Sequence, residues 1–175
     1  MICLTKIYVY NIIGKDIYMI CLKRGGGKIV IIPKIFFDSV IAMTADSGKC
    51  LEYKAKTTYS DLVDEAAGIW NGYKSGVIRK DGLFTLLDVT SDVNIDNGVY
   101  GTTYGGSGSI TLNTFYLKDF TTEQKMHTIL HELGHALGIG HIHISKTNIM
   151  SQGKLSINSL SSLDESSYDK AYSLY

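Results

Sequence analysis

One stretch of eleven residues constrains this chain more than any other: His131-Glu132-Leu133-Gly134-His135-Ala136-Leu137-Gly138-Ile139-Gly140-His141. On an α-helix, residues four positions apart share one face and lie about 6 Å apart along the axis, so His131 and His135 can direct both imidazole rings at one point. That spacing suits two nitrogen ligands of a single zinc ion, each at roughly 2.0–2.1 Å. Glu132 lies about 100° further round the helix and can face a water on that ion without being a ligand.

A glycine in this stretch makes a third ligand feasible. Gly138 follows His135 by three positions, and glycine tolerates the positive φ that commonly ends a helix. The chain can turn back there, so that His141 approaches the same ion from another direction. Three protein nitrogens with a fourth position open are typical of a catalytic zinc site, where the pKa of bound water falls towards about 7. With Glu132 as general base and then general acid, the pattern predicts a hydrolase.

The stretch resembles the zinc-binding motif H-E-x-x-H-x-x-G-x-x-H of the metzincin metallopeptidases, which it matches at every fixed position. The family also has a Met-turn beneath the metal, and Asn148-Ile149-Met150-Ser151 falls where that turn is expected. The resemblance covers about residues 50–175 and looks greatest to the matrixin (matrix-metalloproteinase-like) branch. Two positions depart from the branches: Ile142 stands where matrixins have serine, and Gln152 stands where astacins and serralysins have a metal-facing tyrosine.

This resemblance implies both a fold and an activity. The fold is of the α/β (α+β) class: a twisted mixed β-sheet, two main helices including the zinc helix, and a small C-terminal lobe with the Met-turn and a closing helix. The activity is that of a zinc-dependent metalloendopeptidase, which hydrolyses peptide bonds in proteins. One catalytic Zn²⁺ would be bound by His131, His135 and His141, with Glu132 as the general base and Met150 supporting the metal site.

In that family the substrate lies antiparallel along the edge strand of the sheet and pairs with it through main-chain hydrogen bonds. Strand addition of this kind takes affinity from the backbone and specificity from pockets for alternate side chains, so the expected partner is a polypeptide. By position, the substrate-binding edge consists of Val99, Tyr100, Gly101, Thr102, Thr103 and Tyr104.

Length and charge exclude several other classes of protein. A chain of 175 residues suits one domain with a proper core. Lysine plus arginine and aspartate plus glutamate number 17 each, so no net field favours nucleic acid or an anionic membrane. No apolar run is long and uncharged enough for a membrane span. A surface rich in tyrosine and glycine is compatible with a secreted protein, and we expect an extracellular monomer.

Residues 1–49 are expected to be an N-terminal segment separate from the catalytic domain at 50–175. Short β-prone runs at 7–10, 17–20 and 29–32, separated by glycine turns, favour a small β-meander of accessory strands or a pro-segment. The competing interpretation is an export signal, with Lys23, Arg24 and Lys28 before the apolar run 29–43.

The cysteines leave two interpretations open. Cys3, Cys21 and Cys50 are too few, and odd in number, for a disulfide framework, which favours buried thiols. Alternatively, Cys21 or Cys50 could occupy the open position of the zinc, because thiolate is a good zinc ligand. The matrixin cysteine-switch motif is absent.

Within residues 50–175, the first part of the chain predicts a strand at 51–59 and a helix at 61–73. Ser60 is expected to cap this helix, and Trp70 to pack it onto the sheet. Its predicted apolar stripe consists of Leu62, Ala66, Ile69 and Tyr73.

Further strands are expected at 83–89, 99–104 and 109–116. Thr121 or Thr122 should begin the zinc helix, and a closing helix should start near Leu163. The core-facing side of the zinc helix is expected to consist of Ile129, Leu130, Leu133 and Leu137. A polar loop precedes the edge strand, and its side chains Asp92, Asn94, Asp96 and Asn97 could hold Ca²⁺ or simply face solvent.

Two other histidines and two rival functions complete the expectations. We expect His127 to be partly exposed or behind the ligands, and His143 to point away from the metal. The first rival is a non-catalytic zinc- and peptide-binding module. The second is a zymogen that the segment 1–49 keeps silent.

Overall fold

The N-terminal part of the chain forms a unit of its own in the computed structural model. The described residues are 7–11, 18–22, 45, 49–80, 87–104, 108–143 and 145–174. The chain divides into two compact units, Met1–Asp38 and Ser39–Tyr175. In the first unit, β1 (Ile7–Asn11) pairs antiparallel with β2 (Tyr18–Leu22), as expected for the start of the meander. The third predicted run and the apolar part of the export signal lie outside the described residues, and the role of residues 1–49 stays a prediction.

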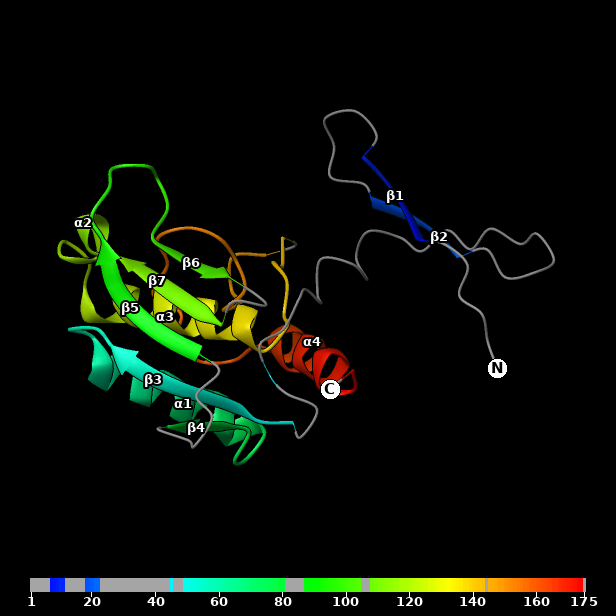
Figure 1. Cartoon of the computed structure of the whole chain (residues 1–175), viewed down its shortest axis with the longest axis horizontal. Helices are drawn as coiled ribbons and strands as arrows, with labels where there is room; N and C mark the ends of the chain where they lie inside the picture. Colours follow the sequence, from blue (N-terminus) through cyan, green and yellow to red (C-terminus); the bar gives the residue numbers. More distant parts are fainter. Residues whose placement is uncertain are drawn as a thin grey trace. The chain divides into compact units, whose positions relative to one another are not determined.

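The second unit contains a five-stranded mixed sheet, coloured from cyan to green in Figure 1. The strands lie in the order β4 (Ile78–Lys80), β3 (Leu51–Lys56), β5 (Leu87–Val93), β7 (Ser109–Asn113) and β6 (Gly101–Tyr104). The first four run parallel to one another, whereas β6 pairs antiparallel with β7 and forms one edge of the sheet. The mixed α/β class and the edge position of the sixth strand are therefore confirmed.

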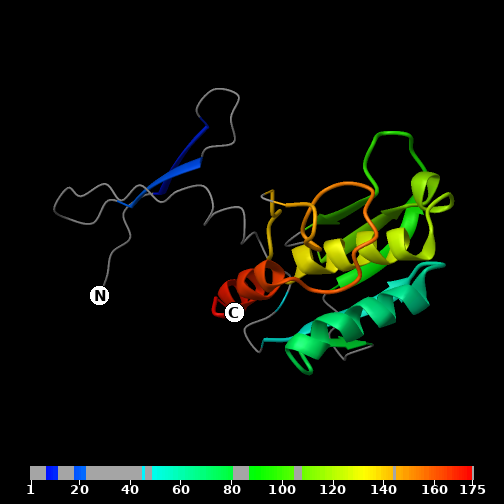
Figure 2. The same ribbon diagram turned by 180° about the vertical axis from the view of Figure 1, so that it is seen from behind.

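The described part of this unit also has four helices. α1 (Ser60–Tyr73) and α3 (Thr122–Ala136) cover the same face of the sheet, as the opposite views in Figure 1 and Figure 2 show. α2 (Thr114–Leu117) directly follows β7, and α4 (Ser162–Tyr172) closes the chain. Among the described residues, no helix combines the length and the apolar character needed to cross a membrane.

α3 forms where its sequence predicts. The Thr121 hydroxyl accepts from the N–H of Gln124, and the Gln124 side chain accepts from the N–H of Thr121, so a reciprocal capping box begins the helix. The predicted core-facing side is at most 2% exposed, in the residues Ile129, Leu130, Leu133 and Leu137. The predicted start of α3 and its predicted core-facing residues are both confirmed.

α1 differs from its prediction in its cap and in its buried face. Ser60 is the first helical residue, and the cap is Tyr59, which makes no side-chain cap bond. The buried residues are Val63, Ala66, Ala67 and Trp70, so the stripe lies about one residue further along than predicted. The helix has apolar residues on two adjacent faces, and the position of its neighbours decides which face is buried.

The elements that pack against α1 include α3 and α4 as well as the sheet. The Trp70 indole N–H donates to the carbonyl oxygen of Leu130 at 3.1 Å, inside the core. The Trp70 ring also meets Tyr168 of α4 edge to face, with ring centroids 5.4 Å apart. The prediction was that Trp70 packs α1 onto the sheet. Instead, Trp70 connects its own helix, α1, to α3 and α4.

Several strand boundaries also differ from the predictions. The strand expected at 51–59 ends at Lys56, and the edge strand begins at Gly101 rather than 99. Of the strand expected at 83–89, residues 83–86 lie outside the described residues, and β5 continues to Val93. β7 ends at Asn113, because the side chain of Asn113 caps α2 by accepting from the Phe115 N–H at 3.2 Å. β4, only three residues long, was not predicted.

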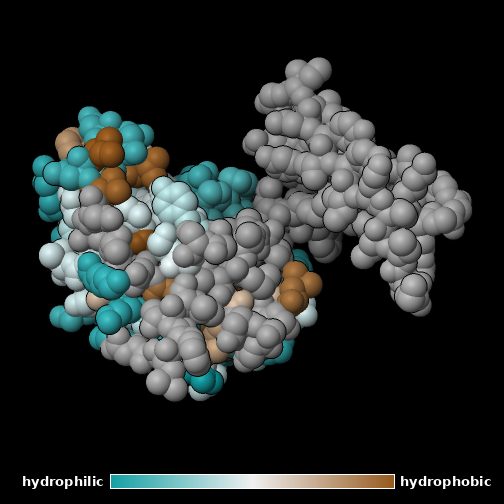
Figure 3. All heavy atoms as spheres, viewed as in Figure 1, coloured by the Kyte–Doolittle hydropathy of each residue, from teal (hydrophilic) through white to brown (hydrophobic). Residues whose placement is uncertain are grey.

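The loop between β5 and β6 is held by side chains from the end of β7 and from α2. Buried Asn113 donates to the carbonyl oxygens of Ile95 and Val99 at 2.8 and 2.7 Å, and the Tyr116 hydroxyl bonds to Asp96. Ile95 and Val99 are 55% and 43% exposed, and Figure 3 shows apolar surface gathered there. Among the candidate calcium ligands of this loop, the side chain of Asp92 lies outside the described residues, so calcium binding stays a prediction.

Candidate metal centre

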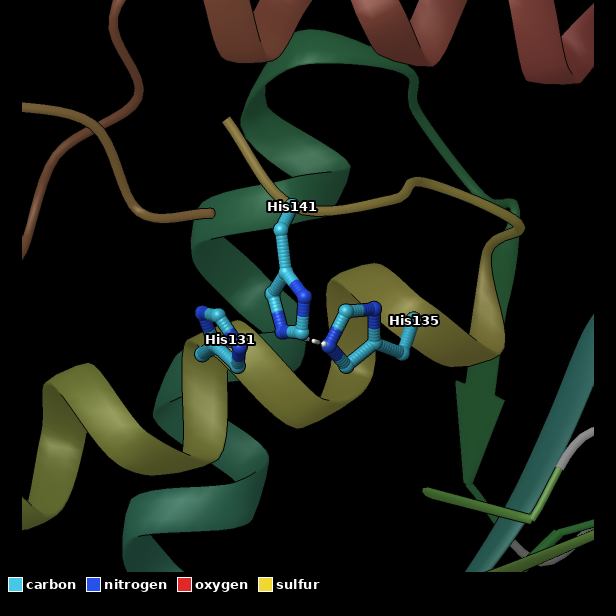
Figure 4. A group of neighbouring side chains, drawn as sticks. All are labelled: His131, His135 and His141. Carbon is cyan, nitrogen blue, oxygen red and sulfur yellow. Dashed lines mark hydrogen bonds between the residues drawn. The ribbon is translucent and has the colours of Figure 1, made fainter. Parts of the chain in front are cut away.

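Three histidines from two segments meet at one point. His131 and His135 extend from the same face of α3, and His141 reaches down from the segment after the helix (Figure 4). One ring nitrogen of each lies within 4.8 Å of the other two. Among the residues that the structure describes, no other group of three or more His, Cys, Asp or Glu side chains could hold one ion. The structure thus brings together all three predicted ligands.

Main-chain carbonyls orient the two helical histidines. His131 Nδ1 lies 2.8 Å from the carbonyl oxygen of Ile149, and His135 Nδ1 lies 2.8 Å from that of Ile139. A neutral imidazole that donates through Nδ1 presents the lone pair of Nε2 on its other side. Both rings are therefore set to offer Nε2 to the common point.

The spacing of the nitrogens fits zinc. His135 Nε2 and His141 Nε2 are 3.1 Å apart. Two nitrogens at roughly 2.0–2.1 Å from one tetrahedral zinc ion would lie about 3.3 Å from each other. The described donors are also all imidazoles, a ligand type that suits zinc. Both the donor chemistry and this separation fit the ion.

Burial keeps the three rings uncharged at neutral pH. It lowers the pKa of His131 to about 3 and that of His141 to about 4, with the neighbouring rings adding to the effect. Burial also lowers the pKa of His135. Because a metal ligand must carry a lone pair, neutral rings are ready to bind without first losing protons.

The end of α3 delivers the third histidine. Gly138 has a φ of 85°, its N–H bonds to the carbonyl oxygen of His135 at 2.9 Å, and the Ile139 N–H bonds to that of Gly134 at 2.9 Å. This pair of bonds is a Schellman motif, which needs a left-handed residue at the position of Gly138. The helix stops there, as predicted, and the chain reverses towards His141.

The residue after the third ligand is tied to the turn that contains Met150. The Ile142 N–H donates to the Met150 carbonyl oxygen at 2.9 Å, and the Ser151 hydroxyl donates to the Ile142 carbonyl oxygen at 3.2 Å. Ile142 is 8% exposed and belongs to the core. The side chain of Ile142 therefore packs into the core, and the hydrogen bonds of its main chain fix the path of the segment that contains His141.

Asp164, at the start of α4, organises the same turn. Its buried carboxylate accepts from the N–H groups of Ile149 and Met150 at 3.0 and 3.1 Å, and from the N–H of Ser161 at 2.8 Å. Ile149 in turn holds His131 through its carbonyl oxygen. Sequence reasoning missed this role, although Ser161 and Asp164 have the spacing of a capping box.

The other candidate ligands lie outside the triad. His127 is buried, not partly exposed: its ring lies between the carbonyl oxygens of Ile157 and Ser151, at 3.1 and 3.4 Å. His143 is exposed, and the centroid of its ring lies 5.7 Å from that of His141, so the prediction that it points away from the metal stays a prediction. Cys50 is buried at the start of the sheet segment and is not among the grouped ligands. Cys3 and the side chain of Cys21 lie outside the described residues.

Glu132 is buried against the edge strand. Its Oε2 lies 2.7 Å from the Thr103 hydroxyl, and a Cβ placed on Gly101 would lie 2.8 Å from its Cγ. Burial raises the pKa of Glu132 to about 7, and hydrogen bonds from Thr103 act in the opposite direction. The carboxyl group can therefore gain and lose a proton near neutral pH.

Of the six residues predicted to bind substrate, two adjoin Glu132. Gly101 and Thr103 face it, so Thr102 and Tyr104 must face the other side of the strand. Tyr100 packs edge to face against Phe120, with ring centroids 5.0 Å apart, and Val99 lies in the preceding loop. These last two therefore precede the strand itself.

The ladder between β6 and β7 shows which main-chain groups face the sheet edge. The Asn113 N–H donates to the Tyr100 carbonyl oxygen at 2.9 Å, so these two residues form a hydrogen-bonded pair. Bonded and non-bonded pairs alternate along an antiparallel ladder. Gly101 and Thr103, opposite Leu112 and Ile110, are therefore non-bonded pairs whose N–H and C=O groups point away from β7.

Gly134 lets the floor of the site approach the helix. A Cβ at this position would lie 2.4 Å from the Met150 sulfur and 3.0 Å from Trp70 Cζ2. We expect Gly134→Ala to lower the free energy of unfolding by about 1–3 kcal/mol through overpacking, measured by urea denaturation. Gly68→Ala is the control, because Gly68 lies on exposed α1 surface with no atom within 4 Å of its Cβ position. It should raise stability by about 0.5–1 kcal/mol, and equal losses in both variants would contradict the close contact.

Comparisons with known proteins bear on the fold. No protein-family model matches the sequence, and no curated protein is significantly similar to it. A chain in the structure described as the GM1-bound form of the ECX AB5 holotoxin aligns over 77% of this chain and 84% of its own, with 15% identity and a TM-score of 0.55. High choriolytic enzyme 1 (HCE-1), a hatching enzyme zinc-protease from the medaka fish Oryzias latipes, aligns over 75% and 94%, with 13% identity and a TM-score of 0.44. The first likeness concerns the fold alone, and the second is too slight to argue from.

Proposed function

We propose that this chain is a zinc-dependent endopeptidase that hydrolyses peptide bonds in polypeptides. The observation that carries the proposal is the meeting of three neutral imidazoles from His131, His135 and His141, one nitrogen of each within 4.8 Å of the others. A buried carboxylate with its pKa raised to about 7 follows the first of these ligands in the chain. Neutral nitrogen ligands beside a carboxyl group poised near neutral pH suit metal-assisted hydrolysis.

The proposed roles follow the chemistry of each group. His131, His135 and His141 would hold the zinc ion, which supplies a Lewis acid that polarises the scissile carbonyl and makes water nucleophilic near pH 7. Glu132 takes a proton from the attacking water and gives it to the departing amine. Met150, fully buried against Gly134 beneath the helix, supports the ligand face of α3.

The edge strand supplies a means of holding an extended peptide. The outward-facing main-chain groups of Gly101 and Thr103 lie beside Glu132, so a peptide added antiparallel to β6 would pass close to it. Gly101 and Thr103 thus remain the central substrate-binding residues of the proposal, with Val99, Tyr100, Thr102 and Tyr104 flanking them. This mode of binding recognises the main chain of the ligand, which suits a polypeptide substrate.

Within hydrolases of this kind, the motif favours a metzincin, and we retain the matrixin branch as the proposed relation. Ile142 is accounted for by its buried side chain and by the bond of its N–H to Met150, so it does not speak against that relation. Gln152 is exposed, which is consistent with a site that does not use a tyrosine at this position. Secretion and a monomeric state stay predictions.

A peptidase assay tests the proposal. Full-length chain loaded with one equivalent of Zn²⁺ should cleave casein or a quenched fluorescent peptide library. Removing the metal with a chelator such as 1,10-phenanthroline should abolish the cleavage, and added Zn²⁺ should restore it. The non-catalytic alternative predicts zinc binding without cleavage. The zymogen alternative predicts that cleavage appears only after residues 1–49 have been removed by limited proteolysis.

A further inference from the structure

Thr103 connects the edge strand directly to Glu132. Its hydroxyl oxygen lies 2.7 Å from Glu132 Oε2 and 2.9 Å from the main-chain carbonyl oxygen of the same residue. We propose that Thr103 is a positioning residue, which holds the Glu132 carboxylate in the orientation needed for proton transfer. This inference rests on the proposed peptidase function and deepens it.

The hold on Glu132 comes from two alternate residues of one strand. A Cβ at Gly101 would lie 2.8 Å from Glu132 Cγ and 2.9 Å from Oε1, so the glutamate side chain fills the space that the glycine leaves open. Thr103, two residues further along, bonds to the other carboxylate oxygen. The main chain of β6 therefore confines one oxygen by close contact, while a hydrogen bond fixes the second.

The main chain of Thr103 stays available to a peptide. Its N–H and C=O groups point towards the sheet edge rather than towards β7, whereas its hydroxyl holds Glu132. The strand that would receive the peptide thus also orients the base.

A hydroxyl is suited to this task through both halves of a proton transfer. It can donate to the carboxylate while Glu132 is ionised. After Glu132 has taken a proton, the hydroxyl can accept from it and donate its own hydrogen to the Glu132 carbonyl oxygen, which is already 2.9 Å away. Thr103 can therefore keep its hold on Glu132 in either state, which an ammonium group (no lone pair) or a carboxylate (no hydrogen) could not do.

Thr103→Val tests the hydroxyl while keeping the branched shape. In the zinc-loaded full-length chain, kcat should fall about tenfold to a hundredfold, in the range seen when partners that orient site residues are removed. KM for a peptide should stay within about twofold, because the main chain of β6 is unchanged. Thr103→Ser should recover at least about half of the native kcat. The control is Thr111→Val, which makes the same change on β7 opposite Thr102 and should leave kcat and KM unaltered.

A second readout does not depend on activity. Crystal structures of the native and Thr103→Val chains should show Glu132 bonded to Thr103 in the first and turned away in the second. The inference is overturned if Glu132 keeps its orientation in Thr103→Val, or if kcat of that variant stays within about twofold of native. A native chain without peptidase activity would remove the proposed function, and the crystallographic comparison would still decide whether Thr103 orients Glu132.

Discussion

Replacing Glu132 by glutamine should abolish peptide hydrolysis while leaving the metal in place. Glutamine has nearly the same shape and can still accept from the Thr103 hydroxyl, which lies 2.7 Å from the carboxylate. It cannot take a proton from water, so kcat/KM should fall by about 10²–10⁴, the usual contribution of general acid–base catalysis. Quenched-peptide kinetics and zinc analysis on the same sample would measure both quantities.

The fold of the Glu132→Gln variant should be intact, which separates a chemical loss from unfolding. Burial raises the pKa of Glu132 from 4.5 to about 7, so the stability of the metal-free chain should fall as the pH rises between these two values, and the full cost of the ionised carboxylate is present at pH 8. A neutral amide does not carry this cost, and the Tm of the metal-free variant at pH 8 should equal or exceed the native Tm. Hydrolysis within about threefold of native would rule out Glu132 as the base.

Replacing Asp164 by alanine should have the largest effect on stability and should reach the metal centre indirectly. The change leaves the buried N–H groups of Ile149 and Met150, and the Ser161 N–H, without their acceptor. Each unsatisfied buried donor costs about 1–3 kcal/mol, so the two buried N–H groups of Ile149 and Met150 should lower the free energy of unfolding by about 2–6 kcal/mol, measured by urea denaturation. Because Ile149 orients His131, zinc affinity should also fall about tenfold to a hundredfold.

Asp169 supplies the matched control for this change on the same helix. Its carboxylate pairs with Lys74 at 2.6 Å on the surface, where ion pairs contribute little to stability. The Asp169→Ala variant should therefore have a urea unfolding midpoint close to that of the native chain, and it should bind zinc with native affinity. If Asp164→Ala behaved like Asp169→Ala in both measurements, the turn at Met150 would have to be held by other contacts.

The zinc helix could be predicted in detail because its signals are local. The capping residues Thr121 and Gln124, the ligands at His131 and His135 and the glycine at its end all act within a few residues of one another. Local chemistry of this kind is visible in a sequence. The edge strand, by contrast, was expected from its position in the metzincin family, and it begins two residues later than expected.

The remaining differences arise from contacts between distant segments. Thr103 and Glu132 are 29 residues apart, and Asp164 is 15 residues from Ile149, so neither contact has a signature in the local pattern. In α1, apolar residues occur on two adjacent faces, and only the approach of α3 and α4 selects the one with Val63 and Trp70. The short α2 depends on the side chain of Asn113, which could equally have continued the strand.

Zinc K-edge X-ray absorption on the full-length chain tests the central claim most directly. The account predicts one zinc ion per chain, with imidazole nitrogens at roughly 2.0–2.1 Å and one further light ligand from solvent. In the His141→Ala variant the imidazole contribution should fall by one third. A sulfur shell at about 2.3 Å, or a spectrum that His141→Ala leaves unchanged, would show that the ion is held elsewhere and would contradict the proposed site.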